Sequence, residues 1–518
     1  MDESVSLEVI SNEGEQLLAY RLRKGVTLDL DFGPKPVLVL DFPLRAISVH
    51  PSWSPVLKRL ASSDFVSIEE IASCTPQIPL EKTEQFMEYL VRKAFCERRG
   101  LLPLRDYPSV SIIIPVRNRR GDLSGCLESL THLKYQPGKT EIIVVDDASD
   151  DDSRHVASKF PVRVFSLRTH KQVSYCRNFA ARRAKGEILA FIDSDCVAHP
   201  LWLKQLVPSF RDPQVGAVGG LVDSDSDKNA LDRYEKVKSS LQVSTWFKRS
   251  TDEEPFFYVP SCNLLVRRDL FLKLEGFKED LHVGEDVDLC WRLQDYGKIL
   301  EYRPVGTVYH KHRNSLWPFC RRRFQYGTSE PILQRLHTDR IKQLRLPLSE
   351  LMVWILIAAS ALLGCAPLLG AAGAILLLDG LSRHARIRKE RLPIPFVATF
   401  MAVVRSCLSL LYHLCTFVSR YFLILFIALF PLIPYPSAGV FCMHLISGVV
   451  QHRTKKPQLN LLAFLALFTL EQLSYQSGVW WGCFRGACVT PLFPRLVFER
   501  NPLSRVREYK VTTGRDGQ

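Results

Sequence analysis

The sequence predicts an α/β protein built on a doubly wound, mostly parallel sheet. A small winged-helix-like α+β module is expected before this sheet and an apolar α-helical region after it. Two observations carry the prediction: short apolar runs alternate with helical segments between residues 105 and 340, as in parallel sheets joined by crossover helices, and the residues beyond 341 are strongly apolar. We therefore expect three units, at residues 1–104, 105–340 and 341–518.

The composition is that of a folded protein with a basic surplus. The chain has 518 residues, of which 47% are hydrophobic and 24% charged, with a net charge of +14. Lys and Arg gather between the apolar segments of the second half, which indicates a membrane surface or bound phosphates rather than nucleic acid. No secretory signal is expected at the amino terminus, and the cysteines lack a Cys-x-x-Cys pair. Reduced thiols and a cytoplasmic location, or the cytoplasmic face of the cell membrane, follow.

The first unit, residues 1–104, has the pattern of a binding or packing module. It contains one expected strand at residues 37–40 and expected helices at residues 52–60, 68–73 and 81–96. No cluster of His, Asp or nucleophilic Ser stands out in it. Such a module can capture a peptide along a strand edge, or it can serve only as a packing platform for the next unit. The residues alone leave both interpretations open.

Four short apolar runs in the second unit predict buried parallel strands. They span residues 110–115, 141–145, 162–165 and 188–192, with helical segments between them. Right-handed crossovers bring the carboxyl ends of such strands to one edge of the sheet, where open α/β sheets bind ligands. Pro115, Asp147 and Asp195 are therefore expected to lie along that edge.

Two carboxylates, Asp193 and Asp195, follow the last of these runs. An isolated Asp-x-Asp is usually a solvated acidic turn, but this one stands at the end of a predicted buried strand. Mg²⁺ prefers carboxylate oxygen and commonly bridges one or two carboxylates to substrate phosphates. The pair therefore predicts a site for a divalent cation and a diphosphate.

Three further side chains are candidates for chemistry at the same edge. Arg177 lies one turn into an amphipathic helix, where it meets a phosphate or a carboxylate or remains a surface arginine. Glu285 and Asp286 begin a later helix, where the helix dipole favours acids and simple capping would explain both. A carboxylate in a cleft can also take a proton from an attacking hydroxyl. Asp286 is the better candidate for that base, with Glu285 orienting the acceptor.

In combination these motifs resemble family 2 glycosyltransferases. The match covers about residues 108–330 and rests on the order and spacing of Pro115 with Arg117-Asn118, Val145-Asp146-Asp147-Ala148-Ser149, Arg177-Asn178, Phe191-Ile192-Asp193-Ser194-Asp195 and Gly284-Glu285-Asp286. The resemblance implies a GT-A fold and an inverting transfer from a nucleoside diphosphate sugar to an acceptor.

The resemblance also implies roles for the individual residues. Pro115, Arg117, Asp146, Asp147 and Arg177 would bind the nucleotide sugar. Asp193 would lie near the ribose and share with Asp195 the Mg²⁺ or Mn²⁺ ion on the diphosphate. Asp286 would deprotonate the acceptor hydroxyl. The cation would offset the charge of the leaving group as a Lewis acid.

The segment Cys320 to Gly327 falls where processive members of this family carry a Gln-x-x-Arg-Trp motif. Cys320 replaces the Gln and Phe324 replaces the Trp, so that only Arg323 fits. This departure disfavours a polysaccharide synthase and leaves Arg323 as a candidate phosphate contact. His310 and His312 precede the segment. Two interpretations are open: one of them helps to hold the metal, or both are ordinary core or surface histidines.

The third unit is apolar enough to suggest contact with a membrane. Residues 351–378 contain no charged residue and are long enough to span a bilayer, yet Gly364 and Pro367 interrupt them. Basic segments flank both ends, which favours a hairpin or an interfacial insertion over a single crossing. A helical region packed on the catalytic unit is the alternative.

The first hundred residues resemble the PqqD-like peptide-recognition module, on Pro43-Leu44-Arg45-Ala46 and the helical tail that ends near Arg99-Gly100-Leu101-Leu102. This module ahead of a family 2 domain resembles the glycosyltransferases of mycofactocin systems. That resemblance implies transfer of a sugar, glucose by expectation, from UDP-glucose to the peptide-derived redox cofactor, building a short oligosaccharide. The alternatives are a polyprenyl-phosphate sugar transferase or membrane polysaccharide synthase, and a catalytically silent peptide-binding scaffold.

Overall fold

The computed structural model describes residues 18–30, 35–41, 44–62, 64–100, 106–250, 257–312, 315–389 and 392–499. The chain forms two compact units. The first comprises Met1–Leu101, Gln343–Leu414 and Arg495–Gln518, and the second comprises Leu102–Lys342 and Cys415–Pro494. The start of the second unit lies close to the predicted boundary at residue 105. The apolar region expected as one third unit is instead divided between the two.

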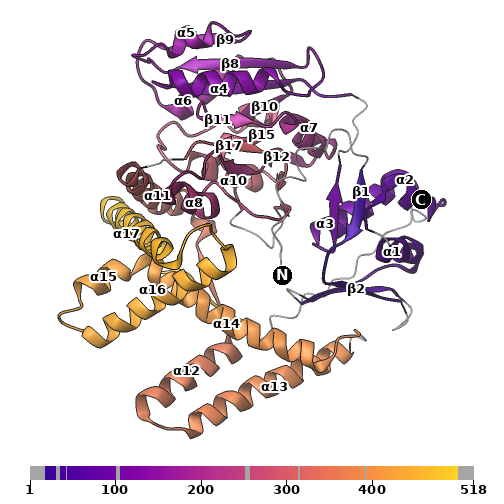
Figure 1. Cartoon of the computed structure of the whole chain (residues 1–518), viewed down its shortest axis with the longest axis vertical. Coiled ribbons are helices and arrows are strands. Elements are labelled where there is room, and N and C mark those ends of the chain that lie inside the picture. Colours follow the sequence, from indigo (N-terminus) through magenta and orange to yellow (C-terminus); the bar gives the residue numbers. More distant parts are fainter. Residues whose placement is uncertain are drawn as a thin grey trace. The chain divides into compact units, whose positions relative to one another are not determined.

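An eight-stranded sheet forms the centre of the second unit (Figure 1). Its strands run in the order β14 (Lys248–Arg249), β16 (Ile299–Tyr302), β12 (Val215–Gly219), β15 (Leu264–Arg267), β10 (Ile188–Phe191), β7 (Val110–Val116), β8 (Thr140–Asp146) and β9 (Arg163–Ser166). Strands β10, β7, β8 and β9 are parallel, whereas β15 is antiparallel to both of its neighbours and β14 to β16. The predicted doubly wound, mostly parallel sheet is confirmed.

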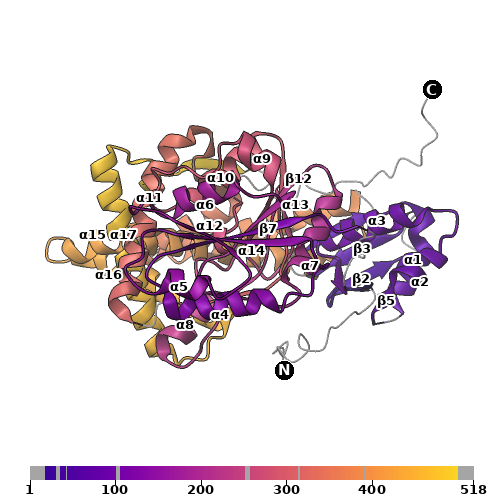
Figure 2. The same cartoon turned by 90° about the horizontal axis from the view of Figure 1, so that it is seen from above.

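Helices cover both faces of this sheet, as the view from above shows (Figure 2). One face carries α4 (Arg120–Thr131), α5 (Ser153–Ala157) and α7 (Trp202–Leu206), and the other carries α6 (Val173–Ala181), α9 (Arg268–Lys273) and α10 (Glu285–Asp295). Along β7, Ile112 and Ile114 pack in the first core and Ile113 in the second. Burial on both faces is the reason why this strand is a continuous apolar run.

A small sheet beside the main one brings two distant segments together. Strand β17 (Val308–His310) lies between β11 (Cys196–Ala198) and β13 (Val222–Ser224). In the antiparallel register of β11 and β17, Cys196 is paired with His310. The residue that follows Asp195 is therefore fixed opposite a histidine more than a hundred positions later in the chain.

Five more helices of the described residues belong to the second unit: α8 (Ala230–Lys238), α11 (Leu316–Leu336), α15 (Leu423–Ala428), α16 (Pro434–Lys455) and α17 (Leu461–Gly486). Glycines let the backbones of α11 and α17 touch. A Cβ atom on Gly327 would clash with the backbone oxygen of Tyr475, and one on Gly478 with that of Phe324. Helix α17 is thus locked directly against α11.

The amino-terminal module of the first unit has the expected small α+β architecture. Its antiparallel sheet has β1 (Ala19–Leu22) between β5 (Val66–Ser67) and β6 (Cys96–Arg99), and it packs with α1 (Ser54–Ala61), α2 (Ile68–Ser73) and α3 (Leu80–Arg92). A second sheet contains β2 (Val26–Asp29), β3 (Val37–Leu40) and β4 (Arg45–Ser48). The helix predicted over residues 81–96 is shorter because Ala94 takes a positive φ of 63° and turns the chain into β6. Pro43 and residues 101–102 of the predicted motif lie outside the described residues.

The apolar segment at residues 351–378 is a helical hairpin rather than one long helix. Helix α12 (Leu348–Leu363) ends at Gly364, which has a φ of +62°, and α13 (Pro367–Lys389) begins three residues later. Proline at a first helical position is favourable because its missing N–H needs no partner there. Near the turn, Leu362 and Leu363 are 85% and 74% exposed.

Apolar residues also join this hairpin region to the amino-terminal module within the first unit. Val37 and Val39 of β3 share one buried cluster with Ile387, Leu392 and Ile394. Helix α14 (Phe396–Tyr421) follows and ends in the second unit. Among the described helices, α14 alone is both long and apolar enough to cross a membrane by length and composition.

Candidate active site

A cavity of about 800 Å³ lies within the second unit, at the carboxyl ends of β7, β8 and β10. Nine of the ten predicted site residues line it: Pro115, Arg117, Asp147, Arg177, Asp193, Asp195, Glu285, Asp286 and Arg323. The exception is Asp146, which is buried and accepts a hydrogen bond from the backbone N–H of Ser149 at 3.2 Å. The structure therefore brings the predicted residues together, with Asp146 supporting a loop from behind.

Asp147 organises the loop that precedes α6. Its carboxylate accepts hydrogen bonds from the backbone N–H groups of Lys171 at 2.6 Å and Gln172 at 2.9 Å, and it lies 2.7 Å from His170 Nδ1. These bonds connect the end of β8 to the start of α6. The side chain of Asp147 thereby holds the loop before α6 at the predicted nucleoside end of the cavity.

Arg177 connects the two groups of carboxylates. It is only 2% exposed, and its guanidinium donates to Asp193 at 2.6 Å and to Glu285 at 3.0 Å. Burial by itself would raise the pKa of Asp193, but the neighbouring Arg177 outweighs it, so that the pKa lies below its ordinary value. Asp193 therefore stays ionised, with one oxygen committed to Arg177.

Asp195 lies beside the side chain best placed to share a cation with it. Its carboxylate is 3.6 Å from His310 Nε2, and the potential ligand atoms of Asp195, Cys196 and His310 lie within 4.8 Å of one another. Asp193, predicted to share the ion, does not belong to this group. A carboxylate and an imidazole that border an open cavity fit a divalent cation whose remaining positions are filled by oxygen ligands.

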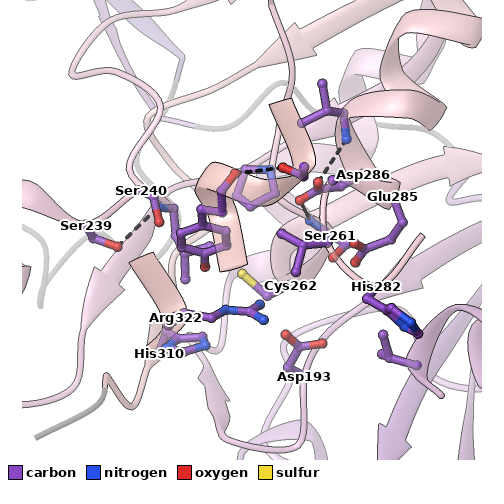
Figure 3. A pocket seen from close by; sticks show the side chains of 18 of the residues that line it. Asp193, Ser239, Ser240, Ser261, Cys262, His282, Glu285, Asp286, His310 and Arg322 are labelled. Atoms are coloured by element: carbon purple, nitrogen blue, oxygen red, sulfur yellow. Dashed lines mark hydrogen bonds between the residues drawn. The ribbon is translucent and has the colours of Figure 1, made fainter. Parts of the chain in front are cut away.

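Asp286 has the environment of a general base. Gly284 precedes it with a φ of +86°, and this left-handed turn begins α10 at the cavity wall. The Asp286 carboxylate accepts hydrogen bonds from the backbone N–H groups of Val287 at 2.8 Å and Ser261 at 3.3 Å. Burial raises the pKa of Asp286 to about 7, and the adjacent Glu285 adds to the rise. Figure 3 shows both carboxylates at the cavity.

Two neighbouring arginines of α11 occupy different environments. Arg323, the residue that fits the family motif, is 4% exposed and is paired with Glu235 at 2.5 Å. Arg322 also lines the cavity and lies over the ring of Tyr326 at 4.7 Å, but it has no carboxylate within ion-pair distance among the described residues. In Figure 3 its guanidinium extends between His310 and Asp193. Arg322 is therefore a cation that is available to the predicted diphosphate site.

Sequence reasoning undervalued two residues of this site. His310 was weighed as a metal ligand or an ordinary histidine, and only the pairing of β11 with β17 places it beside Asp195. Arg322 was passed over because the motif pointed to Arg323. In a run of three arginines on a helix, the sequence does not show which one faces the cavity, since successive side chains are about 100° apart.

The sheet and the carboxylates that converge on one cavity define a glycosyltransferase of the GT-A type. Residues 111–274 match the family model described as glycosyl transferase family 2. The "Glycosyltransferase AglE" of Haloferax volcanii is 30% identical over 260 residues, which cover 48% of this chain and 81% of that relative. The chain belongs to glycosyl transferase family 2.

Similarity extends beyond the catalytic domain in another relative. The "Pre-mycofactocin glycosyltransferase" of Mycobacterium tuberculosis (strain ATCC 25618 / H37Rv) is 28% identical over 398 residues, which cover 75% of this chain and 82% of that relative. Among solved structures, the mannosyltransferase PcManGT from Pyrobaculum calidifontis in complex with GDP-Man and Mn²⁺ is 19% identical. It overlaps 59% of this chain and 88% of its own, with a TM-score of 0.36.

Proposed function

We propose that this protein is an inverting glycosyltransferase that transfers a sugar from a nucleotide sugar to pre-mycofactocin and then extends a short oligosaccharide. We expect the sugar to be glucose. The observation that carries the proposal is the placement of Asp193, Asp195 and Asp286 on one cavity. Similarity to the mycobacterial relative over 75% of this chain supports the acceptor.

The donor occupies the edge of the sheet in this proposal. Pro115, Arg117 and Asp147 border the nucleoside, and Arg322 pairs with the diphosphate. Asp195 and His310 would hold a divalent cation, Mg²⁺ or Mn²⁺, which would supply Lewis-acid stabilisation of the leaving diphosphate. Arg177 keeps Asp193 ionised and in place beside this group.

Asp286 supplies the base in this mechanism. Its carboxylate takes the proton of the acceptor hydroxyl while that oxygen forms the new bond to the anomeric carbon. The bond between the anomeric carbon and the diphosphate oxygen breaks, and its electron pair leaves with the nucleoside diphosphate. A single base on the face opposite the leaving group gives inversion. A pKa of about 7 makes Asp286 a stronger base than an ordinary aspartate while leaving it ionised in much of the protein near neutral pH.

The test is a transfer assay with radiolabelled UDP-glucose, GDP-mannose and UDP-N-acetylglucosamine, each with Mg²⁺ or Mn²⁺. Pre-mycofactocin and a polyprenyl phosphate are offered in parallel as acceptors. We expect labelled product on pre-mycofactocin from UDP-glucose, with inverted anomeric configuration, and none from Asp286→Asn. Asp295→Asn is the matched control, because Asp295 lies on the same helix but is exposed and outside the cavity. Product on the lipid phosphate alone would overturn the proposed acceptor.

Association with a membrane surface is the second part of the proposal. The exposed Leu362 and Leu363 at the α12–α13 turn, together with the basic end of α13, fit shallow insertion into an anionic bilayer. We expect the protein to float with vesicles that contain anionic lipid, and Leu362→Asp with Leu363→Asp to remain in solution. The same assay without anionic lipid separates the apolar from the electrostatic contribution. If the double variant floated with vesicles as the parent protein does, the α12–α13 hairpin would not be the segment that binds the membrane.

The amino-terminal module is proposed to handle the peptide-derived acceptor. Its second sheet leaves β2 and β4 at the edges, since β3 lies between them. An extended peptide can add to such an edge through backbone hydrogen bonds. Titration of the labelled precursor peptide against the full chain, followed by fluorescence anisotropy, tests this. Binding unaffected by an Ile47→Pro substitution in β4 would exclude that edge.

A further inference from the structure

Helices α15 and α16 form a hairpin in the second unit that has no role in the chemistry proposed above (Figure 1). The chain leaves α15 at Ala428, turns through residues 429–433 and returns along α16. From residue 421 to residue 452 it contains no Asp, Glu, Lys or Arg. Charged side chains are the usual residues of a surface that faces water, so their absence over this length indicates different surroundings.

The exposed side chains of this hairpin are apolar. In the turn, Phe430 is 53% and Leu432 is 78% exposed, and Phe441 and Ile446 are exposed on α16. Among the exposed residues from 424 to 446, the polar side-chain groups are the hydroxyl of Tyr435 and one thiol. Single exposed apolar residues are normal, whereas a contiguous apolar patch marks an interaction site.

Helix α16 directs its polar side chains toward the protein. His444 is buried, and its ring nitrogens lie 2.8 Å from Ser419 Oγ of α14 and 2.9 Å from Thr469 Oγ1 of α17. Ser447 Oγ lies 3.0 Å from Thr416 Oγ1. A surface helix in water has the opposite arrangement, with its apolar stripe on the core and its polar face outside. Helix α16 is therefore suited to apolar surroundings, in which polar groups find their partners inside the protein.

Both arms of the hairpin are fixed to the second unit at the ends far from the turn. Before α15, the backbone oxygen of Tyr421 accepts the indole N–H of Trp480 at 2.7 Å. Near the end of α16, Gln451 Oε1 accepts a hydrogen bond from Lys238 Nζ at 2.6 Å. The hairpin thus leaves this unit and returns to it, with residues 429–433 as its tip.

The dimensions of α16 fit one leaflet of a lipid bilayer. From Pro434 to Ile446 the helix rises about 18 Å, close to half of a hydrocarbon core that is about 30 Å thick. The exposed Arg453 and Lys456 lie about 10 to 15 Å further along, where they can pair with anionic head groups. Protein interfaces carry about one hydrogen bond per 100–200 Å², and this apolar face offers almost no group for one. A bilayer therefore fits it better than a partner protein.

We propose that the α15–α16 hairpin is embedded in one leaflet of an anionic phospholipid membrane, with its turn in the hydrocarbon and Arg453 and Lys456 at the phosphates. This contact belongs to the unit that contains the cavity, and it is separate from the α12–α13 turn of the first unit. It depends on neither the proposed donor nor the proposed acceptor. The catalytic unit thereby has a membrane anchor of its own.

Cys442 is a reporter within the proposed contact. It is exposed on the same side of α16 as Ile446, and the half-buried Cys74 of the amino-terminal module is the internal control. The full chain is treated with a charged methanethiosulfonate, with and without vesicles of phosphatidylcholine and phosphatidylglycerol, and each cysteine is followed by peptide mass spectrometry. We expect vesicles to slow the reaction of Cys442 at least about 10-fold and to leave Cys74 unchanged, because hydrocarbon excludes both thiolate and reagent.

Two other outcomes of this experiment would overturn the proposal. Equal rates for Cys442 with and without vesicles would place α16 in water. Protection that needs no lipid and rises with protein concentration would mean that a second copy of the chain covers the hairpin.

Substitutions in the turn test the same contact by a lipid titration. Phe430→Glu with Leu432→Glu should lower the vesicle partition constant by about 10- to 100-fold, because a charge in hydrocarbon is unfavourable. Phe430→Leu with Leu432→Phe is the matched control, which keeps the same two side chains in exchanged order and should partition as the parent does. Thermal unfolding in solution should be alike in all three proteins. An unchanged partition constant in the glutamate variant would contradict insertion of the turn, and equal losses in both variants would indicate a shape-specific protein contact instead.

The two hairpins can be tested separately. At lipid concentrations high enough to bind Leu362→Asp with Leu363→Asp, Cys442 should still be protected, because its contact belongs to the second unit. Loss of this protection would contradict an anchor in the catalytic unit. The Cys442 experiment contains neither donor nor acceptor, so a failure of the proposed transfer reaction would leave its result unaffected.

Discussion

The two ends of the cavity are built in different ways. At the sheet end, where β7, β8 and β10 end, the partners are held by strand register: Arg177 bonds Asp193, 16 positions away, and Glu285, 108 positions away. At the helical end, between α8, α11 and α17, Arg323 and Glu235 are 88 positions apart, and Tyr234 and Glu471 are 237 apart. The sheet end depends on loops that follow the strands of one sheet, whereas the helical end depends on the packing of separate helices.

This difference separates the groups that the proposed transfer reaction uses from the helices that complete the cavity. Asp193 and Asp195 line the cavity at the sheet end, and Asp286 and Arg322 line it from α10 and α11. At the helical end, Glu330 is paired with Lys342 and Glu471 lies beside Arg323. Substitutions at the two ends should therefore change different kinetic constants.

The largest effect is expected at Asp286. Asp286→Asn should lower kcat by about 100- to 10,000-fold, the usual contribution of a general base. It should not lower Tm at pH 8, because burial and Glu285 disfavour the ionised carboxylate that the substitution removes. Steady-state kinetics and thermal unfolding measure both. A drop in kcat accompanied by a large fall in Tm would indicate a structural role instead.

The proposed cation site gives the next largest effect. His310→Gln should raise the Mn²⁺ concentration for half-maximal activity by about 10- to 100-fold, as when a group that supports a metal is removed. Isothermal titration with Mn²⁺ and UDP measures the binding directly. His155→Gln, an exposed histidine on α5, is the control and should leave the titration unchanged. Equal Mn²⁺ affinity in His310→Gln and the parent protein would exclude His310 as a ligand.

Arg321, Arg322 and Arg323 allow three adjacent positions to be compared. Arg323→Met should cost about 3 to 5 kcal/mol of unfolding free energy, because it leaves the buried Glu235 without its closest partner. Arg322→Met should raise KM for the nucleotide sugar about 10-fold, the loss of one ionic hydrogen bond of about 1.5 kcal/mol, with little change in stability. Arg321→Met, at an exposed position, should change neither. If a stably folded Arg323→Met variant showed a larger increase in KM for the nucleotide sugar than Arg322→Met, then Arg323 and not Arg322 would be the phosphate contact.

The smallest effect is expected in the pH dependence of activity, which tests whether the reaction requires Asp286 in its ionised form. Asp286 has a pKa raised to about 7, so it is protonated below that pH and cannot accept a proton. We expect kcat/KM to fall about tenfold for each pH unit below 7 and to level off above it. The residual activity of Asp286→Asn should lack this inflection. A flat profile between pH 5 and 8 in the parent protein would be incompatible with Asp286 as the base.

The strands of the catalytic sheet were predictable because each is short, apolar and bounded by polar residues. The runs at residues 110–115 and 188–192 correspond to β7 and β10, and their polar ends meet at the cavity. The helix at residues 68–73 and the strand at residues 37–40 were also predicted with their observed bounds. Local patterns sufficed for these elements.

The division of the apolar region was not predictable in the same way. Residues beyond 341 share one composition, yet those up to Leu414 belong to the first unit and those from Cys415 to Pro494 to the second. Composition records that a helix buries apolar surface but does not identify its partner. Packing of Ile387 with Val37 and of Gly478 with α11 decides the partners, and these contacts link distant parts of the chain.

By itself the sequence determined the α/β core, the carboxylates at the strand ends and the helix that begins with Glu285 and Asp286. These follow from local periodicity, strand ends and capping, which act over a few residues. Only the tertiary structure decided that His310 lies beside Asp195, and that Arg322 faces the cavity while Arg323 is paired. Those outcomes depend on strand register, helix rotation and packing between segments far apart in the chain, which no local pattern specifies.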